Sequence, residues 1–554
     1  MYFTVYNEIR EALAAQTGCG EADLTDGGEH ADLASTVAFR LAKVRKMAPA
    51  RIAAELAEEL RPILEPRDIA VEATGPYLNF RFGMSYVQGA VKAALLPGFG
   101  AMPVKKERIC IEHTSANPNG PLHVGHIRNS IIGDSLARAF RKAGYPLEVE
   151  YYINDMGRQI AIVSWGFSHL GLDRRENEKA DHYVARVYIA ANRAIEADPS
   201  IKEEIERRMA LIERGDPETV VAFRKAVDLC VGGIRETLAR LNVSHDRFVR
   251  ENDFVRNHHM LGVINRLRLL PEARNEGTLS LDLSAFGFEK EYVIRRSDGT
   301  SVYAARDLAY HEWKAHNFDV VIDVLGADHK LIGAQLQATL RLLGVLPPEI
   351  VHFEFVSLPE GSMSTRAGTF VSADELIDEV TVRAFDEVTV RRPELPEEQR
   401  REIARSVAVG AIRYDIIRVS PEKSTVFDWK EALNFERQSA PYIQYAHARA
   451  SSILEKAGSY EEAFSFATEH EIRLAKQIAR FPRVIELVVT ERRPHLLSVY
   501  ARELADLFNT FYRYDPVLKS EGKTRNSRLT LVRAAQNTLK EALETLGIDA
   551  LGSM

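Results

Sequence analysis

Cysteine is scarce in this sequence, and no long hydrophobic run occurs. The 554 residues contain three cysteines, Cys19, Cys110 and Cys230, with no CxxC spacing among them. This scarcity argues against a disulfide framework or a cysteine-rich zinc site, and it favours a reducing compartment. No window approaches the roughly 18 uninterrupted apolar residues of a membrane-spanning helix, and the N-terminus lacks the basic and apolar regions of a signal peptide. We therefore expect a cytoplasmic protein without membrane contact.

The sequence also lacks a net positive charge and any excess of glycine or proline. A net charge of −7 gives no overall attraction to nucleic acid, although a single region can still be basic. The 33 glycines and 22 prolines are about average usage, which excludes collagen-like and low-complexity chains. With 45% hydrophobic and 27% charged residues, the chain is expected to form three or four globular domains of roughly 150 residues each.

Residues 1–104 are expected to form a small α+β domain. A helical pattern over 33–46 is followed by short strand patterns over 69–71 and 77–82. The turn-forming sequence at 95–100 marks a plausible boundary with the next region.

Residues 105–395 are expected to form an α/β domain around a parallel nucleotide-binding sheet, a Rossmann-like fold. Strand patterns occupy residues 109–112, 147–153, 320–325 and 353–358. An amphipathic helix is predicted between the first two strands, over residues 122–142. A mostly helical, charge-rich stretch over about 160–295 separates the two halves of the sheet, so we interpret it as an insertion.

Residues 396–554 show helical periodicity almost throughout and predict an all-α bundle. Helices are expected over residues 446–457, 470–490, 496–512 and 528–546. Residues 471–554 contain 14 lysines and arginines against 10 aspartates and glutamates, so this region is basic within an acidic chain. Basic and aromatic residues are interleaved there: Arg492, Arg493, Tyr500, Arg502, Phe508, Phe511, Tyr512, Arg513, Tyr514, Lys519, Lys523, Arg525 and Arg528. Such a surface suits a single-stranded RNA loop, but aromatics at helical spacing more often form a core and arginines a solvated face.

One stretch carries most of the chemical information: EHTSANPNGPLHVGHIR, from Glu112 to Arg128, which follows a predicted strand and opens a predicted helix. The N–H groups and partial positive charge of a helix N-terminus bind anions, and phosphate is the natural ligand. Gly125 lets a nucleotide approach the backbone. His123 and His126 fall on one side of the first turn, where both can donate to phosphoryl oxygens. A metal-binding pair and structural histidines are the alternatives, and a metal would need a third ligand of clear spacing.

The same stretch resembles the HIGH signature of class I aminoacyl-tRNA synthetases, and its longer pattern resembles that of the arginyl-tRNA synthetases. The family's glutamate, Ser-x-Asn-Pro and His-x-Gly-His-x-Arg are present as Glu112, Ser115, Asn117, Pro118 and residues 123–128. Further blocks similar to the family lie at residues 75–80, 154–159, 303–310, 326–329, 363–368 and 440–449. The resemblance implies ligation of arginine to tRNA with ATP, and it implies that 396–554 is an anticodon-binding domain.

The resemblance also implies roles for individual residues. ATP is expected to contact His123, Gly125 and His126, together with Met363, Ser364 and Arg366 of a loop that resembles the KMSKS motif. Of these, His123, His126 and Arg366 are expected to be catalytic. Arginine is expected to contact Glu112, Ser115, Asn117, Tyr303, Asp307 and His329. The two carboxylates suit a guanidinium, since bidentate pairing supplies both energy and geometry. Taken without the family pattern, Tyr303 and Asp307 would be a turn aromatic and a helix cap.

The partners that the resemblance implies are L-arginine, ATP with Mg²⁺, and tRNA(Arg). We expect no protein-bound metal and a monomeric chain. The N-terminal region, 1–104, is either a module that contacts the body of the tRNA, as the resemblance implies, or a structural cap on the catalytic domain. In the first case, the basic residues Arg40, Lys43 and Arg45 are candidates to contact RNA phosphates.

The sequence departs from the family at positions that bear on the mechanism. Ser362 and Ala367 stand where many class I enzymes carry loop lysines, and no lysine precedes the first histidine of the HIGH-like motif. Arg366 or Lys330 is the candidate for the missing positive charge. These departures leave two further hypotheses: a tRNA-binding paralogue without catalysis, and a related ligase that acts on a small-molecule acceptor. The basic bundle speaks against the second.

Overall fold

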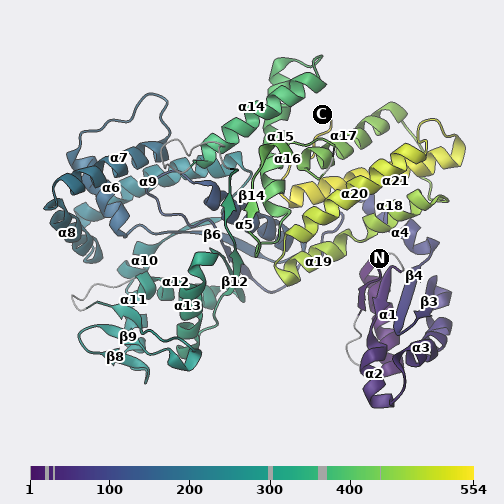
Figure 1. Ribbon diagram of the computed structural model, residues 1–554, viewed down its shortest axis with the longest axis horizontal. Coiled ribbons are helices and arrows are strands. Elements are labelled where there is room, and N and C mark those ends of the chain that lie inside the picture. Colours follow the sequence, from purple (N-terminus) through teal and green to yellow (C-terminus); the bar gives the residue numbers. More distant parts are fainter. Residues whose placement is uncertain (1, 19–23, 29–30, 297–302, 360–370, 437) are drawn as a thin grey trace.

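Figure 1 shows the computed structural model, in which the α/β domain lies beside a helical bundle and a small N-terminal domain lies below that bundle. The structure describes residues 2–18, 24–28, 31–296, 303–359, 371–436 and 438–554. The α/β fold class, the small α+β domain and the all-α C-terminal bundle expected from the sequence are confirmed. Among the described residues, no helix combines the length and apolar character that crossing a bilayer requires.

Five parallel strands form the central sheet, in the order β12-β11-β5-β6-β7. Their bounds are β5 Ile109–Glu112, β6 Leu147–Ile153, β7 Arg247–Arg250, β11 Val320–Gly326 and β12 Glu349–Phe353. All four residues of β5 are buried, as a central strand covered on both faces requires. The strand order reverses between β5 and β11, and doubly wound sheets bind their ligands at the carboxyl ends of strands at such a reversal.

The segment expected to be a mostly helical insertion also contains strands. Its helices are α6 Arg158–His169, α7 Ala180–Ala197, α8 Ile201–Glu213, α9 Pro217–Arg240, α10 Glu251–Arg256 and α11 His259–Leu267. Strand β7 pairs with β6 at the edge of the central sheet. Strands β8 Ala273–Asn275, β9 Leu279–Leu281 and β10 Tyr292–Arg295 form a separate antiparallel sheet. Because β7 is only four residues long and begins and ends with arginine, it has no apolar run by which it could be predicted.

The second half of the α/β domain contains α12 Tyr303–Asn317, the short helix η3 Ala327–His329, and α13 Lys330–Leu342. The strand expected over 353–358 is wrong in its bounds. Strand β12 ends at Phe353, and β13 Val356–Ser357 pairs instead with β14 Thr425–Val426, in a two-stranded sheet of its own.

The N-terminal domain is a four-stranded antiparallel sheet, in the order β1-β2-β4-β3, with helices packed against it. The strands are β1 Leu24–Asp26, β2 Leu33–Ser35, β3 Ile69–Thr74 and β4 Tyr77–Phe82, and the helices are α1 Tyr2–Thr17, α2 Val37–Arg45, α3 Pro49–Leu64 and α4 Met84–Ala94. The helix expected from residue 33 begins at Val37, because the preceding residues pair with β4. Lys476 of the bundle forms an ion pair with Asp32 at 2.6 Å, so the domain docks on the bundle.

Helix α14 Ala373–Arg391 precedes the C-terminal region, which consists almost entirely of helices. The helices of this region are α15 Glu397–Ile417, α16 Trp429–Ala432, α17 Ala440–Ala457, α18 Glu469–Ala479, α19 Phe481–Glu491, α20 His495–Tyr514 and α21 Gly522–Thr545. The single helix expected over 470–490 is two helices, α18 and α19. The break falls at Arg480, since the ring of Pro482 clashes with a continuing helix and the residue has no N–H to donate.

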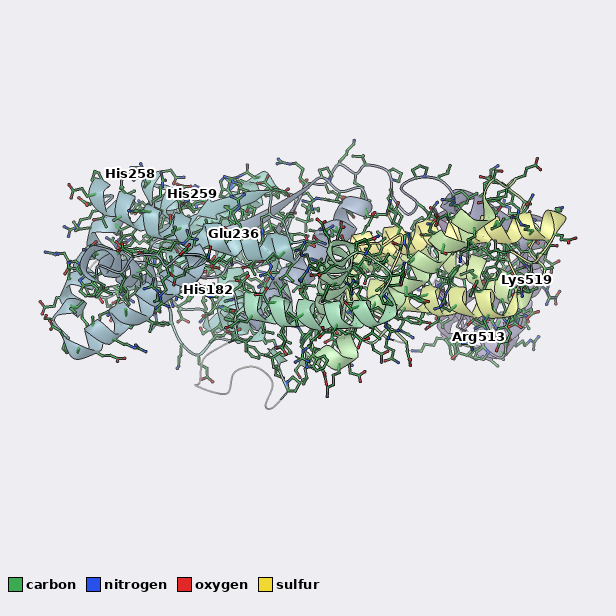
Figure 2. All side chains as sticks on the ribbon, turned by 90° about the horizontal axis from the view of Figure 1, so that it is seen from above. His182, Glu236, His258, His259, Arg513 and Lys519 are labelled. Atoms are coloured by element: carbon green, nitrogen blue, oxygen red, sulfur yellow. The ribbon has the colours of Figure 1, made fainter. Side chains whose placement is uncertain are left out.

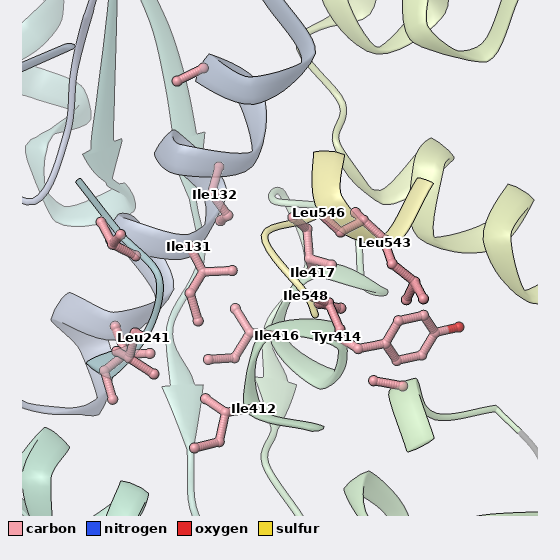
Figure 3. Close-up of a cluster of buried hydrophobic side chains, with 14 of the residues drawn as sticks. Ile131, Ile132, Leu241, Ile412, Tyr414, Ile416, Ile417, Leu543, Leu546 and Ile548 are labelled. Carbon is pink, nitrogen blue, oxygen red and sulfur yellow. The ribbon is translucent and has the colours of Figure 1, made fainter. Parts of the chain in front are cut away.

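A continuous core joins the α/β domain to the bundle. Figure 3 shows Ile131 and Ile132 of helix α5, Val124–Lys142, beside Ile412 and Ile416 of α15 and Leu546 after α21. All five side chains are almost completely buried. Helix α5, which begins at the end of β5, is therefore held by the sheet on one side and by the bundle on the other.

Candidate active site

The two histidines of the HIGH-like motif cap the N-terminus of α5. The Nδ1 atom of His123 accepts the backbone N–H of Gly125 at 3.1 Å, and the Nδ1 atom of His126 accepts the backbone N–H of His123 at 3.2 Å. The two rings stack with their centroids 3.7 Å apart. Because each Nδ1 is an acceptor, each neutral ring carries its proton on Nε2.

Both histidines are neutral at physiological pH. Burial and the neighbouring ring of His123 lower the pKa of His126 to about 3, and burial lowers the pKa of His123. The site therefore offers Nε2–H donors on two neutral rings, together with the positive end of a helix dipole. Neutral rings can donate hydrogen bonds to phosphoryl oxygens without any change in their protonation.

Gly125 stands where a side chain would crowd the first histidine. A Cβ atom at this position would lie 3.0 Å from Cε1 of His123. The absence of a side chain at this position therefore leaves room for the His123 ring to cap the helix.

The loop after β5 adopts a strained backbone that places Ser115. Thr114 and Ser115 have φ values of +70° and +39°, in the left-handed region that non-glycine residues rarely occupy. Thr114 donates its N–H to Oδ1 of Asn129 at 2.7 Å, and Asn129 in turn donates to the carbonyl of Val324 at 3.0 Å. The loop is thus tied to both α5 and β11.

The structure brings Ser115 and Glu112 together, at the carboxyl end of β5. The hydroxyl of Ser115 donates to Oε1 of Glu112 at 2.9 Å and accepts the N–H of Tyr152 at 3.0 Å. The second oxygen of Glu112 accepts from Lys314 of α12 at 2.7 Å. Asp307, one helical turn after the first residue of α12, is buried and pairs with Nδ1 of His311 at 3.1 Å.

The other residues expected to bind arginine are more exposed. Tyr303, the first residue of α12, is 44% exposed, and Asn117 is an exposed residue of the otherwise largely buried loop after β5. His329 follows β11 and pairs with its neighbour Asp328 at 3.2 Å. Because β5 and β11 are parallel neighbours, Asn117 and His329 follow the same edge of the sheet, but neither makes a hydrogen bond with Glu112 or Asp307 within the described residues.

The residues of the loop that is expected to contact ATP cannot be placed relative to the histidines. Met363, Ser364 and Arg366 lie outside the described residues, so their expected roles remain predictions. Lys330, the other candidate for the missing positive charge, begins α13 and pairs with Glu354 at 3.0 Å on an exposed surface.

Three buried residues of the site were missed from the sequence: Lys314, Asp323 and His311. Asp323 lies inside the apolar strand β11, where a charge requires a partner. The sequence shows that charge, but its partners lie on other elements, and Glu112 is 202 positions away from Lys314. A charged residue within a strand that is otherwise apolar was the available signal.

Within the part of the chain that the structure describes, two clusters have the side chains of a metal site, but in each a lysine ammonium lies between two carboxylates. Glu112, His311 and Asp323 come together around Lys314, whose Nζ lies 2.7 Å from each carboxylate. In the second cluster, Asp181, His182 and Asp374 surround Lys179, with Nζ at 2.9 and 2.8 Å from the two aspartates. Each cluster is an ion-pair network in which a protein cation stands where a metal ion would bind.

The basic and aromatic region of the bundle separates into core and surface. Tyr500, Phe508 and Phe511 are buried, as the core hypothesis predicts, whereas Tyr512 and Tyr514 are exposed. Several arginines pair with acidic side chains, among them Arg492 with Glu349, Arg493 with Glu422, Arg502 with Asp506 and Arg528 with Glu471 and Asp515. Figure 2 shows Arg513 and Lys519 toward one end of the molecule, on the bundle.

Models of known protein families match three successive stretches of the chain. The family model of the class I tRNA synthetase (R) catalytic domain matches residues 91–429, that of the DALR anticodon-binding domain matches 443–554, and that of the arginyl-tRNA synthetase N-terminal domain matches 7–82. The chain is 68% identical to the arginine–tRNA ligase of Methanoregula boonei over 99% of both chains, and 64% identical to that of Methanosphaerula palustris over the full length of both. The solved arginyl-tRNA synthetase of Thermus thermophilus superimposes with a TM-score of 0.88 at 31% identity, over 100% of this chain and 99% of the other.

The parallel sheet carries, where its strand order reverses, a helix whose N-terminus is capped by two histidines, and a helical bundle follows. Together with the match of the catalytic-domain model, these features identify a class I aminoacyl-tRNA synthetase. The family models and the full-length relatives narrow this class. The chain belongs to the arginyl-tRNA synthetases, and it is an enzyme of arginine–tRNA ligation. The function expected from the sequence is confirmed, and the hypotheses of an inactive paralogue and of a small-molecule ligase are set aside.

Proposed function

We propose that His123 and His126 hold the phosphates of ATP through their Nε2–H groups while the carboxylate of arginine attacks the α-phosphorus. The observation that carries this proposal is the pair of Nδ1 acceptors, which fixes the tautomer of both rings. Pyrophosphate leaves as the new mixed anhydride forms, and the terminal ribose hydroxyl of tRNA then attacks the arginyl carbonyl and releases AMP. The protein positions the reactants and neutralises developing charge, as is usual in phosphoryl and acyl transfer.

The guanidinium of arginine is assigned to the two buried carboxylates. Glu112 and Asp307 supply acceptors on neighbouring elements, and planar bidentate pairing favours arginine over a point charge such as lysine. Tyr303, at the exposed start of α12, is assigned to cover the substrate. Ser115, Asn117 and His329 complete the expected contacts with arginine.

Arg366 is assigned to neutralise the negative charge of the leaving pyrophosphate, with Lys330 as the alternative. Mg²⁺ enters as the counterion of ATP, a substrate. Neither buried acidic cluster suits this ion, because Lys314 and Lys179 already neutralise the carboxylates there. In this proposal, the metal is held by phosphate oxygens.

We assign tRNA binding on the bundle to a surface formed by α17 and α20. The guanidinium of Arg449 lies 4.7 Å from the ring centre of Tyr445 and 5.3 Å from that of Tyr512. Both tyrosines are more than 40% exposed. Exposed aromatic faces joined by a cation offer stacking platforms for unpaired bases, and Arg513 beside them can pair with phosphate.

The N-terminal domain carries a second candidate RNA surface. Phe39 of α2 and Tyr77 of β4 are 45% and 46% exposed, and their rings meet edge to face at 5.6 Å. Arg40 and Lys43 lie on the same helix and are exposed. Figure 1 shows α2 at the far end of this domain from the bundle, a position that suits contact with an RNA body.

We further infer a monomeric enzyme in the cytoplasm, where tRNA charging and a reducing environment coincide. The described cysteines, Cys110 and Cys230, are free thiols in buried positions. The decisive experiment for the proposed site is ATP–pyrophosphate exchange by His123→Asn and His126→Asn variants. The proposal predicts a large loss of exchange with the fold intact, and full activity in both variants would overturn it.

A further inference from the structure

Three buried charged groups connect the two carboxylates assigned to the substrate. Glu112 pairs with Lys314 at 2.7 Å, and Lys314 pairs with Asp323 at 2.7 Å. Asp323 pairs with Nε2 of His311 at 2.7 Å, and Nδ1 of His311 lies 3.1 Å from the carboxylate of Asp307 and 2.8 Å from its backbone carbonyl. The series alternates in sign and runs from β5 through α12 and β11 back to α12. We call these five residues the charge series.

The ends of the charge series are more open than its middle. The side chain of Lys314 is fully buried, and those of Asp323 and His311 are 3% and 5% exposed. The terminal carboxylates, Glu112 and Asp307, are 10% and 12% exposed. The two end carboxylates are therefore the most accessible members of the charge series, and the three middle groups lie deeper.

The middle groups are held in their charged forms by their neighbours. Burial alone lowers the pKa of His311, but Asp307 and Asp323 outweigh burial and the nearby lysine and raise the pKa to about 10. Burial likewise opposes the charge on Lys314, but Asp323 and Glu112 raise its pKa above its ordinary value. The ring of Tyr310, with its centre 4.3 Å from Nζ of Lys314, faces the ammonium from the same helix. Three carboxylates and two cations leave one net negative charge, which matches one guanidinium.

We propose that Lys314, Asp323 and His311 are positioning residues that lock Glu112 and Asp307 at a fixed separation and so select arginine over lysine. A guanidinium needs two acceptors in a fixed planar geometry, whereas an ammonium accepts many arrangements. Carboxylates that are locked before binding lose little freedom when the guanidinium enters, which raises affinity for that shape alone. Loosening the charge series is therefore expected to reduce the affinity for arginine more than the affinity for lysine. This inference rests on the proposed arginine site, and it adds the groups that hold that site.

A buried ion network can also serve stability alone, so the test needs a readout that stability does not move. Lys314→Met and the nearly isosteric Asp323→Asn break the charge series in full-length protein. Lys179→Met is the matched control, since it removes another ammonium from between two buried carboxylates away from the charge series. Glu112→Gln and Asp307→Asn report on the proposed arginine site itself.

The measurements are ATP–pyrophosphate exchange with arginine and with lysine in the presence of tRNA, and calorimetric binding of arginine alone. The expected result is a rise of at least tenfold in the KM for arginine in Lys314→Met and Asp323→Asn, a KM for ATP within twofold of the parent, and a fall of at least tenfold in the preference for arginine over lysine. Lys179→Met is expected to lower the melting temperature but to leave the arginine KM and the preference unchanged.

The inference is overturned if both series variants keep the parental KM and preference while Glu112→Gln and Asp307→Asn lose arginine binding. If those two end variants also bind arginine normally, the proposed arginine site is wrong as well. Where Lys314→Met does not fold, Asp323→Asn carries the test, because it replaces one carboxylate oxygen with an NH2 group of similar volume.

Discussion

The guanidinium of Arg413 donates to the carboxylate of Asp134 at 2.6 Å, and both side chains are completely or almost completely buried. The pair joins α15 of the bundle to α5, the helix that carries the paired histidines. Arg413 also donates to the carbonyls of Leu546 and Leu241, at 2.8 and 2.7 Å. The orientation of the candidate active site is therefore coupled to the bundle.

Replacing Arg413 with methionine is expected to destabilise the whole chain. Breaking a buried pair leaves an uncompensated charge, which typically costs 3–5 kcal/mol, and we expect about 3 kcal/mol because Asp134 keeps a second arginine partner, Arg138, at 2.7 Å. Chemical denaturation followed by circular dichroism measures the loss. Arg401→Met, which breaks an exposed pair with Glu397, is the control and should leave the midpoint nearly unchanged. Equal midpoints for the two variants would contradict the coupling.

His126→Asn separates capping from phosphate binding. The asparagine oxygen can occupy the position of Nδ1 and keep the hydrogen bond to the N–H of His123, but no group replaces Nε2–H. We expect kcat for ATP–pyrophosphate exchange to fall by about 10²–10³, the usual loss when one transition-state donor is removed. His123→Asn is expected to behave alike, with its oxygen accepting from Gly125. The far-ultraviolet circular dichroism spectrum of each variant should stay like that of the parent. If activity is lost only because the variants unfold, the histidines have a structural role alone.

The low pKa of His126 predicts a pH dependence of stability with a definite sign. Its pKa is about 3 when folded and 6.5 in the unfolded chain, so between these values the unfolded state alone binds the proton. Stability therefore falls as pH falls below 6.5, by about 1.4 kcal/mol per pH unit from this group. Comparing the parent with His126→Asn between pH 6 and 4.5, we expect the parent to lose about 2 kcal/mol more. Parallel curves would contradict the burial of a neutral ring.

Tyr512→Ala is expected to weaken tRNA binding without loss of stability. Removal of a stacking face typically costs about 1–3 kcal/mol per base. Phe286→Ala, which removes a 39% exposed ring from the α/β domain, is the control and should bind tRNA as the parent does. Filter binding at matched salt measures both. If the two variants bind equally well, the tRNA surface lies elsewhere on the bundle.

Arg40→Gln combined with Lys43→Gln tests the N-terminal domain. If this domain contacts the tRNA body, the slope of log affinity against log salt should flatten by about one for each phosphate that the variant no longer neutralises. Arginine activation should not change, because α2 is remote from the α/β domain in Figure 1. An unchanged salt slope would favour the structural-cap hypothesis.

Local patterns predicted the elements that carry the histidines. Strand β5 and helix α5 follow from an apolar run, a loop and an amphipathic repeat, so the expected bounds of 109–112 and 122–142 agree with the structure to within two residues. Strand β7 was missed because its pairing with β6, and not its composition, makes it a strand.

The charge series could not be predicted because its members are brought together by the fold. Lys314 and His311 lie on one face of a helix that is otherwise ordinary, and they acquire their roles only when β5 and β11 become neighbours. The same holds for the bundle aromatics. Spacing alone does not distinguish Phe508, which is buried, from Tyr512, which is 44% exposed.

The most direct test of the central claim is ATP–pyrophosphate exchange with each amino acid in turn, with and without total tRNA, in magnesium buffer. The account predicts exchange with arginine and with no other amino acid at a comparable rate. Exchange that appears only when tRNA is added would still agree with it and would make the RNA part of the active-site assembly. Absence of arginine-dependent exchange in both conditions, or equal exchange with another amino acid, would contradict it.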